Sequence, residues 1–242
     1  MKIVLLYAMH KEIESLLPKG QGMPMRTLAG VDFYAIRENV VAVTGGVGKV
    51  NAAMATQLSI SLFSPDLIIN CGVAGCFENV PIGTILLADG FVQHDVDTTG
   101  CGDPIGLVST VNVVDFPTHD LALAKKAMDR AGIRYLCGKG ATGDWFAKAG
   151  KRAEWVRDTF RPLFIEMEGG AVAQVCMRNH VRFMAVKSVS DCLFGNDQYH
   201  FNFPTAMRDL NDHVMRWLDV LEGEMEKETC AKGECDGTNS EF

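Results

Sequence analysis

Residues 40–62 read VVAVTGGVGKVNAAMATQLSISL, and this stretch decides the fold class. It begins with an apolar run rich in β-branched residues, which is typical of a buried strand. The glycines in residues 45–48 then favour a tight turn, and residues 50–62 predict a helix. A strand joined to a helix by a short turn is the repeating unit of α/β domains with a parallel sheet.

The same alternation of strand and helix extends over most of the chain. Further buried strands are predicted at residues 2–7, 67–71, 84–92, 135–138 and 183–189. Further helices are predicted at residues 121–131, 148–158, 167–177 and 204–222. We therefore expect one three-layer α/β/α domain over residues 1–222, with a mixed, mostly parallel central sheet. Residues 223–242 are polar and contain glycine, so we expect a disordered tail there.

Composition and charge exclude several classes of protein. The formal net charge of −7 argues against nucleic-acid binding, because neutralising phosphates requires a basic face. No apolar run reaches the ~18 residues of a membrane-spanning helix, and the apolar start lacks a cleavage site, so we expect a soluble cytoplasmic protein. The eight cysteines are scattered, which predicts reduced thiols. Cys230 and Cys235 by themselves form only an incomplete zinc site.

Acidic side chains follow the predicted strands at their carboxyl ends, where α/β sheets bind ligands. Glu12 follows the first strand and begins a helix, where it either complements the helix dipole or serves as a general base. Asp191 follows the strand at residues 183–189, where it either caps a turn or helix or points into the cleft as an acid. The pattern of residues leaves both alternatives open at both positions.

Two glycine loops and a carboxylate pair also favour a ligand cleft. The loops at residues 44–49 and 70–75 follow neighbouring strands. The first is not a Walker phosphate loop, because Lys49 is not followed by serine or threonine. Glu166 and Glu168 share one face if their segment is extended, and they are either a surface pair or buried functional groups. An interior position would require a partner for each carboxylate.

Taken in order, these segments resemble the methylthioadenosine/S-adenosylhomocysteine nucleosidases of the nucleoside phosphorylase superfamily. The similarity extends over residues 1–222 and includes MKIVLLYAMHKEIESLL, TGGVGKVNAA, PDLIINCGVAG, ATGDWF, EMEGGAVAQVC and VKSVSD. Each segment is weak evidence by itself, whereas their shared order is strong evidence. The resemblance implies a nucleoside phosphorylase-like fold and hydrolysis of the N-glycosidic bond of a 5′-substituted adenosine. It also implies a homodimer that binds a small purine nucleoside and needs no metal or cofactor.

Three carboxylates carry the chemistry that the resemblance implies. In such a site Glu12 activates the attacking water, Asp191 protonates N7 of the purine, and Glu168 holds the ribose hydroxyls. Cleavage builds positive charge on the ribose and negative charge on the base, so the base needs an acid and the sugar benefits from carboxylates. An acid that stays protonated near neutral pH needs a raised pKa, which burial supplies.

The remaining site residues are implied to bind the substrate. Phe146 stacks on the base, the backbone of Ala147 meets the base edge, and Met167 packs against the sugar. Ser190 supports Asp191. The full set of expected binding residues is Met9, Val73, Phe146, Ala147, Met167, Glu168 and Ser190.

Some positions depart from the pattern of the family. Val73 stands where a serine is usual, and Lys187 stands where an arginine is usual near the ribose-binding glutamate. A lysine keeps the charge but cannot form a two-pronged contact with a carboxylate. The stretch DVDTTGCGDPIG after His94 is also short and poor in aromatic residues. These departures leave open whether the 5′ group is methylthio, homocysteinyl, deoxy or something else.

Two other functions remain as alternatives. One is a phosphate-dependent purine nucleoside phosphorylase, and the other is a non-catalytic nucleoside-binding relative. The first glycine loop continues as residues 49–52, KVNA, with apolar and small residues where a phosphate cradle would add polar ones, which favours water as the nucleophile. A protein that only binds has no need of an acid and a base on opposite faces of its ligand, which favours an enzyme.

Overall fold

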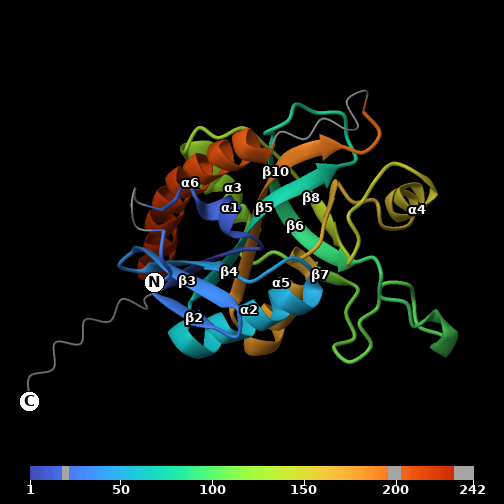
Figure 1. Ribbon diagram of the computed structural model, residues 1–242, viewed down its shortest axis with the longest axis horizontal. Coiled ribbons are helices and arrows are strands. Elements are labelled where there is room, and N and C mark those ends of the chain that lie inside the picture. Colours follow the sequence, from blue (N-terminus) through green and yellow to red (C-terminus); the bar gives the residue numbers. More distant parts are fainter. Residues whose placement is uncertain (18–21, 196–202, 232–242) are drawn as a thin grey trace, which may run out of the picture.

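A ten-stranded mixed sheet forms the centre of the computed structural model, which describes residues 1–17, 22–195 and 203–231 (Figure 1). β1 (Ile3–Tyr7) lies between β4 (Val40–Thr44) and β5 (Leu67–Cys76) and runs parallel to both. β10 (Arg182–Cys192) runs parallel to β5 along its whole length. These buried parallel strands are the ones that the continuous apolar runs predict.

The rest of the sheet closes into a ring. β6 (Ile85–Gln93) pairs antiparallel with β10 and parallel with β8 (Tyr135–Thr142). β9 (Phe164–Glu166) joins β8 to β5 and so completes the ring. The remaining strands are β2 (Arg26–Leu28) and β3 (Val31–Arg37) beyond β4, and β7 (Asp115–Pro117) beside β6.

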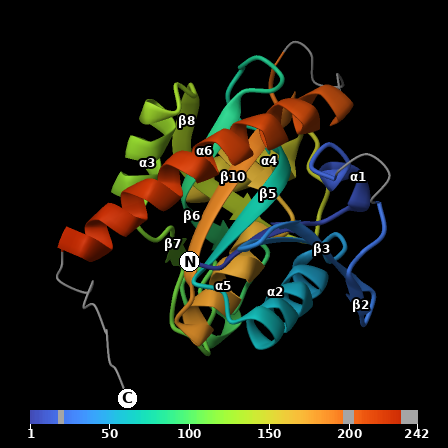
Figure 2. The same cartoon turned by 90° about the vertical axis from the view of Figure 1, so that its left-hand side faces the viewer.

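Helices cover both faces of the sheet, as expected for three layers (Figures 1 and 2). One face packs against α3 (Leu121–Arg130) and α6 (Phe203–Ala231), and the other packs against α2 (Lys49–Phe63) and α5 (Gly169–Asn179). Alternate residues of β1 divide between the two cores, because successive side chains of a strand point to opposite faces. The two helices outside these layers are α1 (His10–Ile13) and α4 (Lys151–Phe160).

The predicted strands are confirmed, but three of them extend further than expected. β8 was expected to end at Gly138 and continues to Thr142. β5 was expected to end at Cys71 and continues to Cys76, through a segment that contains glycine. β10 was expected to end at Val189 and continues to Cys192. β5 and β10 pair with each other over this added length, so tertiary pairing keeps both extended up to the cavity described below.

The expected disordered tail is wrong for residues 223–231, because α6 continues to Ala231. Figure 2 shows α6 crossing one face of the sheet beside α3. The buried carboxylate of Glu224 pairs with Lys126 and Arg130 of α3, and these contacts hold the last turns of α6 in place. Residues 232–242, including Cys235, lie outside the described residues.

The prediction of free thiols is confirmed for the cysteines whose side chains are described: Cys71, Cys76, Cys101, Cys137, Cys176 and Cys192. Across residues 1–17, 22–195 and 203–231, no helix combines the length and the apolar character needed to cross a membrane.

Candidate active site

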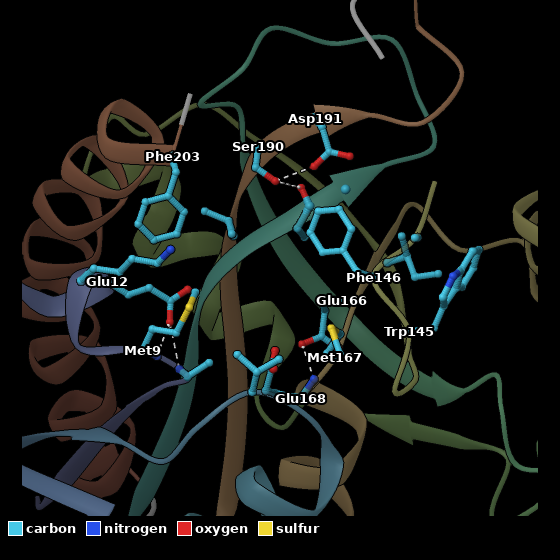
Figure 3. A pocket seen from close by; sticks show the side chains of 18 residues that line it. Met9, Glu12, Trp145, Phe146, Glu166, Met167, Glu168, Ser190, Asp191 and Phe203 are labelled. Carbon is cyan, nitrogen blue, oxygen red and sulfur yellow. Dashed lines mark hydrogen bonds between the residues drawn. The ribbon is translucent and has the colours of Figure 1, made fainter. Parts of the chain in front are cut away.

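A cavity of about 260 Å³ opens where the carboxyl ends of β1, β5 and β10 meet the segment that links β9 to α5 (Figure 3). Its position follows the rule that α/β sheets bind ligands at the carboxyl ends of their strands. Every site residue expected from the sequence lines it: Met9, Glu12, Val73, Phe146, Ala147, Met167, Glu168, Ser190 and Asp191.

Glu12 is buried at the start of α1 and lines the cavity, with one carboxylate oxygen held in place by backbone donors. Its Oε2 accepts hydrogen bonds from the backbone N–H groups of Ala8 and Met9, at 2.9 and 2.8 Å. A Cβ atom on Gly72 would lie 3.1 Å from Oε1, so glycine allows β5 to pass close to this oxygen. Burial raises the pKa of Glu12, although both backbone bonds oppose the shift. A fixed carboxylate with a raised pKa is suited to accept a proton.

Asn211 of α6 supports Glu12 from behind. Its Nδ2 donates to the carbonyl oxygen of Glu12 at 2.8 Å and to Oγ of Ser15 at 2.7 Å. Its Oδ1 accepts a hydrogen bond from the hydroxyl of Tyr7 at 2.9 Å. The side chain of Asn211 therefore ties α1 to both α6 and β1, which fixes the position of the helix that carries Glu12.

Asp191 lies near the end of β10 and is partly buried. The register between β10 and β5 shifts between Val189 and Asp191, and such bulges redirect side chains. The hydroxyl of Ser190 donates to Oδ1 of Asp191 at 2.7 Å. Burial raises the pKa of Asp191, while the bond from Ser190 opposes the shift. The group is therefore easier to keep protonated than an exposed aspartate, as a general acid requires.

Glu166 and Glu168 are both buried, but their partners differ. Glu166 accepts bonds from the hydroxyl of Thr142, the ammonium of Lys187 and the backbone N–H groups of Glu168 and Gly169. These donors occupy both of its oxygens, so Glu166 organises the site rather than binding a ligand. The ammonium of Lys187 is thus paired with Glu166. Lys187 also lies near Glu168, as expected, because its charge acts to lower the pKa of Glu168.

Glu168 is the less constrained of the two carboxylates. Its Oε1 accepts one hydrogen bond, from the backbone N–H of Gly48 at 3.0 Å. Burial and then the charge of Glu166 raise the pKa of Glu168 to about 7. Glu168 is therefore free to accept hydrogen bonds from a bound ligand.

A latch made of Lys49, Asp95 and Asp144 joins the first glycine loop to the loop that carries Phe146. The ammonium of Lys49 lies 2.6 Å from Oδ1 of Asp95, and the backbone N–H of Asp144 donates to Oδ2 at 2.9 Å. The backbone N–H of Lys49 donates to Oδ1 of Asp144 at 2.8 Å. Burial acts to raise the pKa of Asp95, but the bonds from Lys49 and Asp144 outweigh it and lower the pKa.

A sequence model of the phosphorylase superfamily matches residues 2–218. The chain belongs to the phosphorylase superfamily. A 5′-methylthioadenosine/S-adenosylhomocysteine nucleosidase of Geobacillus kaustophilus is 36% identical over 235 residues, covering 91% of this chain and 98% of the relative. The corresponding nucleosidase of a Marinomonas species is 37% identical over 196 residues, covering 78% and 85%. The resemblance inferred from the segments of the sequence is therefore confirmed.

Solved structures of this superfamily agree with the fold. A nucleosidase of Colwellia psychrerythraea, in complex with adenine, superposes with a TM-score of 0.80 at 30% identity, covering 91% of this chain and 96% of that one. A futalosine hydrolase mutant of Helicobacter pylori has a TM-score of 0.81 at 27% identity, covering 90% and 99%. The expectation of a nucleoside phosphorylase-like α/β fold is confirmed.

Several cavity residues of this superfamily member did not emerge from the sequence. Lys11 and Phe203 line the cavity together, although they are far apart in the chain, and Trp145 lines it beside Phe146. In the sequence, Lys11 precedes Glu12 and Phe203 precedes Pro204. Both positions predict only the start of a helix, and neither predicts a place in the cavity. Their shared position depends on the packing of α6 against α1.

Proposed function

We propose that this chain hydrolyses the N-glycosidic bond of a 5′-substituted adenosine and releases adenine and the ribose moiety. The named activities of its relatives support cleavage of adenosine derivatives. The observation that carries the proposal is the placement of Glu12 and Asp191, two carboxyl groups with raised pKa values, on different sides of one cavity (Figure 3). One group can give a proton to the base while the other takes a proton from water.

In this mechanism the bond between C1′ and N9 breaks and its electron pair leaves with the purine. Asp191 delivers its proton to N7 and so neutralises the departing base, with Ser190 orienting the carboxyl group. Water adds its oxygen to C1′ and loses a proton to Glu12, whose position is fixed by its two backbone bonds. The ionised form of Glu168 binds the ribose hydroxyls and stabilises positive charge that develops on the sugar.

The other cavity residues position the nucleoside. Phe146 is 62% exposed above the cavity and supplies a ring face on which the base stacks. The backbone of Ala147 meets the base edge, and Met167 packs against the sugar. Met9 and Val73 complete the apolar lining on the sugar side.

The backbone donors of the glycine loop support water rather than phosphate as the nucleophile. The first N–H groups of a helix are a common binding site for phosphate oxygens. At the start of α2, the N–H of Gly48 is bonded to Glu168 and the N–H of Lys49 is bonded to Asp144. Two negatively charged side chains therefore occupy the positions that a phosphate would need.

The test is release of adenine from methylthioadenosine, S-adenosylhomocysteine and 5′-deoxyadenosine in phosphate-free buffer. We expect turnover of at least one substrate and no stimulation by added phosphate. Strict dependence on phosphate would instead identify a phosphorylase. Tight nucleoside binding without turnover, unaffected by Asp191→Asn, would identify a non-catalytic binder.

We also propose that the active form is a homodimer in which the partner subunit closes the 5′ pocket. Two apolar residues beside the glycine loop, Val47 and Val50, are 42% and 79% exposed, which suits a surface that a second copy covers. Sedimentation of the active protein is expected to show a dimer. A monomer with full activity would contradict the proposal.

A further inference from the structure

One wall of the cavity is formed by Met9, Val47, Lys11 and Phe203. Figure 3 shows Met9 and Phe203 across the cavity from Phe146 and Trp145. Three of the four side chains are apolar, whereas the fourth carries a positive charge. This wall is therefore apolar and positively charged, whereas Glu12, Glu166 and Glu168 make another part of the cavity lining acidic.

The wall lies where the 5′ substituent of a nucleoside would project. This step rests on the proposed function, which places the base at Asp191 and Phe146 and the ribose hydroxyls at Glu168. Met9 and Phe203 lie on the side of the cavity opposite Phe146 (Figure 3). A 5′ group that extends from the sugar away from the base therefore reaches them. The side chains of this wall then decide which 5′ groups bind well.

Lys11 differs from the other two lysines near the cavity. Lys49 is paired with Asp95, and the buried Lys187 is paired with Glu166. Lys11 is exposed, and within the described part of the chain no carboxylate lies at ion-pair distance from it. Its ammonium instead lies 4.4 Å from the centre of the Phe203 ring, a typical cation–π contact.

We propose that Lys11 and Phe203 form a subsite for 5′ substituents that consist of an apolar chain ending in a carboxylate. The apolar segment packs on Met9 and Phe203, and the carboxylate reaches the ammonium of Lys11 at the rim. The contact with the Phe203 ring holds that ammonium beside the apolar wall, so little side-chain entropy is lost when the anion binds. The subsite selects for negative charge at the end of the 5′ group.

The charge of Lys11 also affects the neighbouring Glu12. This effect on catalysis must be separated from the selectivity of Lys11 for the 5′ group. The charge of Lys11 lowers the pKa of Glu12 against the larger effect of burial. Removing Lys11 would thus alter the reaction of every substrate to the same extent. The ratio of kcat/KM between two substrates cancels that common effect and reports the 5′ subsite alone.

The experiment compares three adenosines whose 5′ groups have nearly the same length: propylthio, 2-carboxyethylthio and 2-aminoethylthio. In the unmodified protein, kcat/KM is expected to be about fivefold higher for the carboxylate than for the propyl compound, and lowest for the amine. Lys11→Met should bring the carboxylate and propyl compounds to equal values. Lys11→Glu should make the amine the preferred substrate. Lys125→Met, in α3 and outside the cavity lining, is the matched control and should keep the original order.

Two failures are distinguishable. If all three compounds release adenine at the same kcat/KM, or if Lys11→Met leaves their ratio unchanged, the subsite is refuted and the proposed hydrolase stands. If no compound releases adenine while the protein remains folded, the proposed function itself fails. Loss of the carboxylate preference in 0.5 M NaCl, at about a 4 Å screening length, would further support an electrostatic origin.

Discussion

At the inner end of the cavity, Lys187 is 1% exposed and its ammonium lies 3.0 Å from Glu166, which has further donors on both oxygens. At the outer wall, Lys11 is exposed and its ammonium lies over the ring face of Phe203, with no carboxylate at ion-pair distance among the described residues. Burial acts to lower the pKa of Lys187, but the charges of Glu166 and Glu168 outweigh it and raise the pKa. The ammonium of Lys187 is thus used within the protein to hold Glu166, whereas the ammonium of Lys11 is available to bind a ligand.

The comparison separates two tasks within one cavity. At the inner end, backbone hydrogen bonds fix the carboxylates of Glu12 and Glu166, whereas Glu168 accepts one bond and can accept others from a ligand. We assign the chemistry of bond cleavage to this end. The outer wall has fewer internal bonds, so it can differ in composition without disturbing the carboxylates. The following predictions test this division, beginning with the largest expected effect.

Asp191→Asn should break the chemistry at the inner end while preserving the fold. Asparagine can still accept the hydrogen bond from Ser190 but cannot give a proton to the purine. We expect kcat for adenine release to fall by about 10³-fold, within the usual range for a general acid. Circular dichroism should show an unchanged thermal transition. A variant that retains more than about a tenth of the activity would remove Asp191 from the acid role.

The same substitution at the two lysines should have very different consequences for the free energy of unfolding. Lys187→Met leaves the buried carboxylate of Glu166 without its cation, and we expect the free energy of unfolding to fall by about 3–5 kcal/mol. Lys11→Met removes an exposed side chain and should change it by less than about 0.5 kcal/mol. Urea denaturation measures both, with Lys187→Arg as the charge-preserving control. Equal effects at the two positions would contradict the division into an inner and an outer end.

Glu168→Gln should reveal the pH dependence that the inner end imposes on stability. The pKa of Glu168 is about 7 in the folded protein, against an ordinary value of 4.5, so the folded state binds this proton more tightly than the unfolded chain. The stability that the group contributes is therefore fully present below pH 4.5 and is lost as the pH rises toward about 7. Glutamine does not titrate, so the stability of the Glu168→Gln variant does not fall over this pH range.

We expect Glu168→Gln to gain stability relative to the unmodified protein between pH 4 and pH 8, by on the order of 1–3 kcal/mol. Urea denaturation at a series of pH values measures the difference. A constant difference across that range would show that Glu168 titrates as it does in the unfolded chain. Because Glu168 is assigned to the ribose hydroxyls, the more stable variant should also be a much poorer enzyme.

Asp95→Asn should have the smallest effect, because it loosens the latch without touching the carboxylates. The amide oxygen can still accept from the N–H of Asp144, but Lys49 loses its ionic partner. The loop that carries Phe146 then becomes less ordered, so we expect KM to rise by about three- to tenfold and kcat to change by less than about twofold. Steady-state kinetics separate the two constants. A fall in kcat alone would show that Asp95 acts on the reacting groups instead.

The main buried strands, the helices and the acidic residues at the strand ends could be predicted from the sequence alone. Apolar runs, glycine turns and helical spacing are local patterns, and they predict buried strands whose carboxyl ends carry Glu12 and Asp191. The strands β2, β7 and β9 escaped detection because three residues are too few to show a period. The seven-residue strand β3 was also missed. The added length of β5 and β10 also escaped, since pairing between the two strands keeps it extended.

Only the tertiary structure decided which groups meet. Whether Glu12 was a dipole-capping residue or a cavity carboxylate depended on Asn211 and Gly72, which are distant in the chain. The partner of Lys187 and the contact between Lys11 and Phe203 likewise arise from elements that pack together only in the folded protein. Local patterns record the conformation of a segment, whereas burial, charge pairing and the shape of a cavity depend on distant residues that the fold brings together.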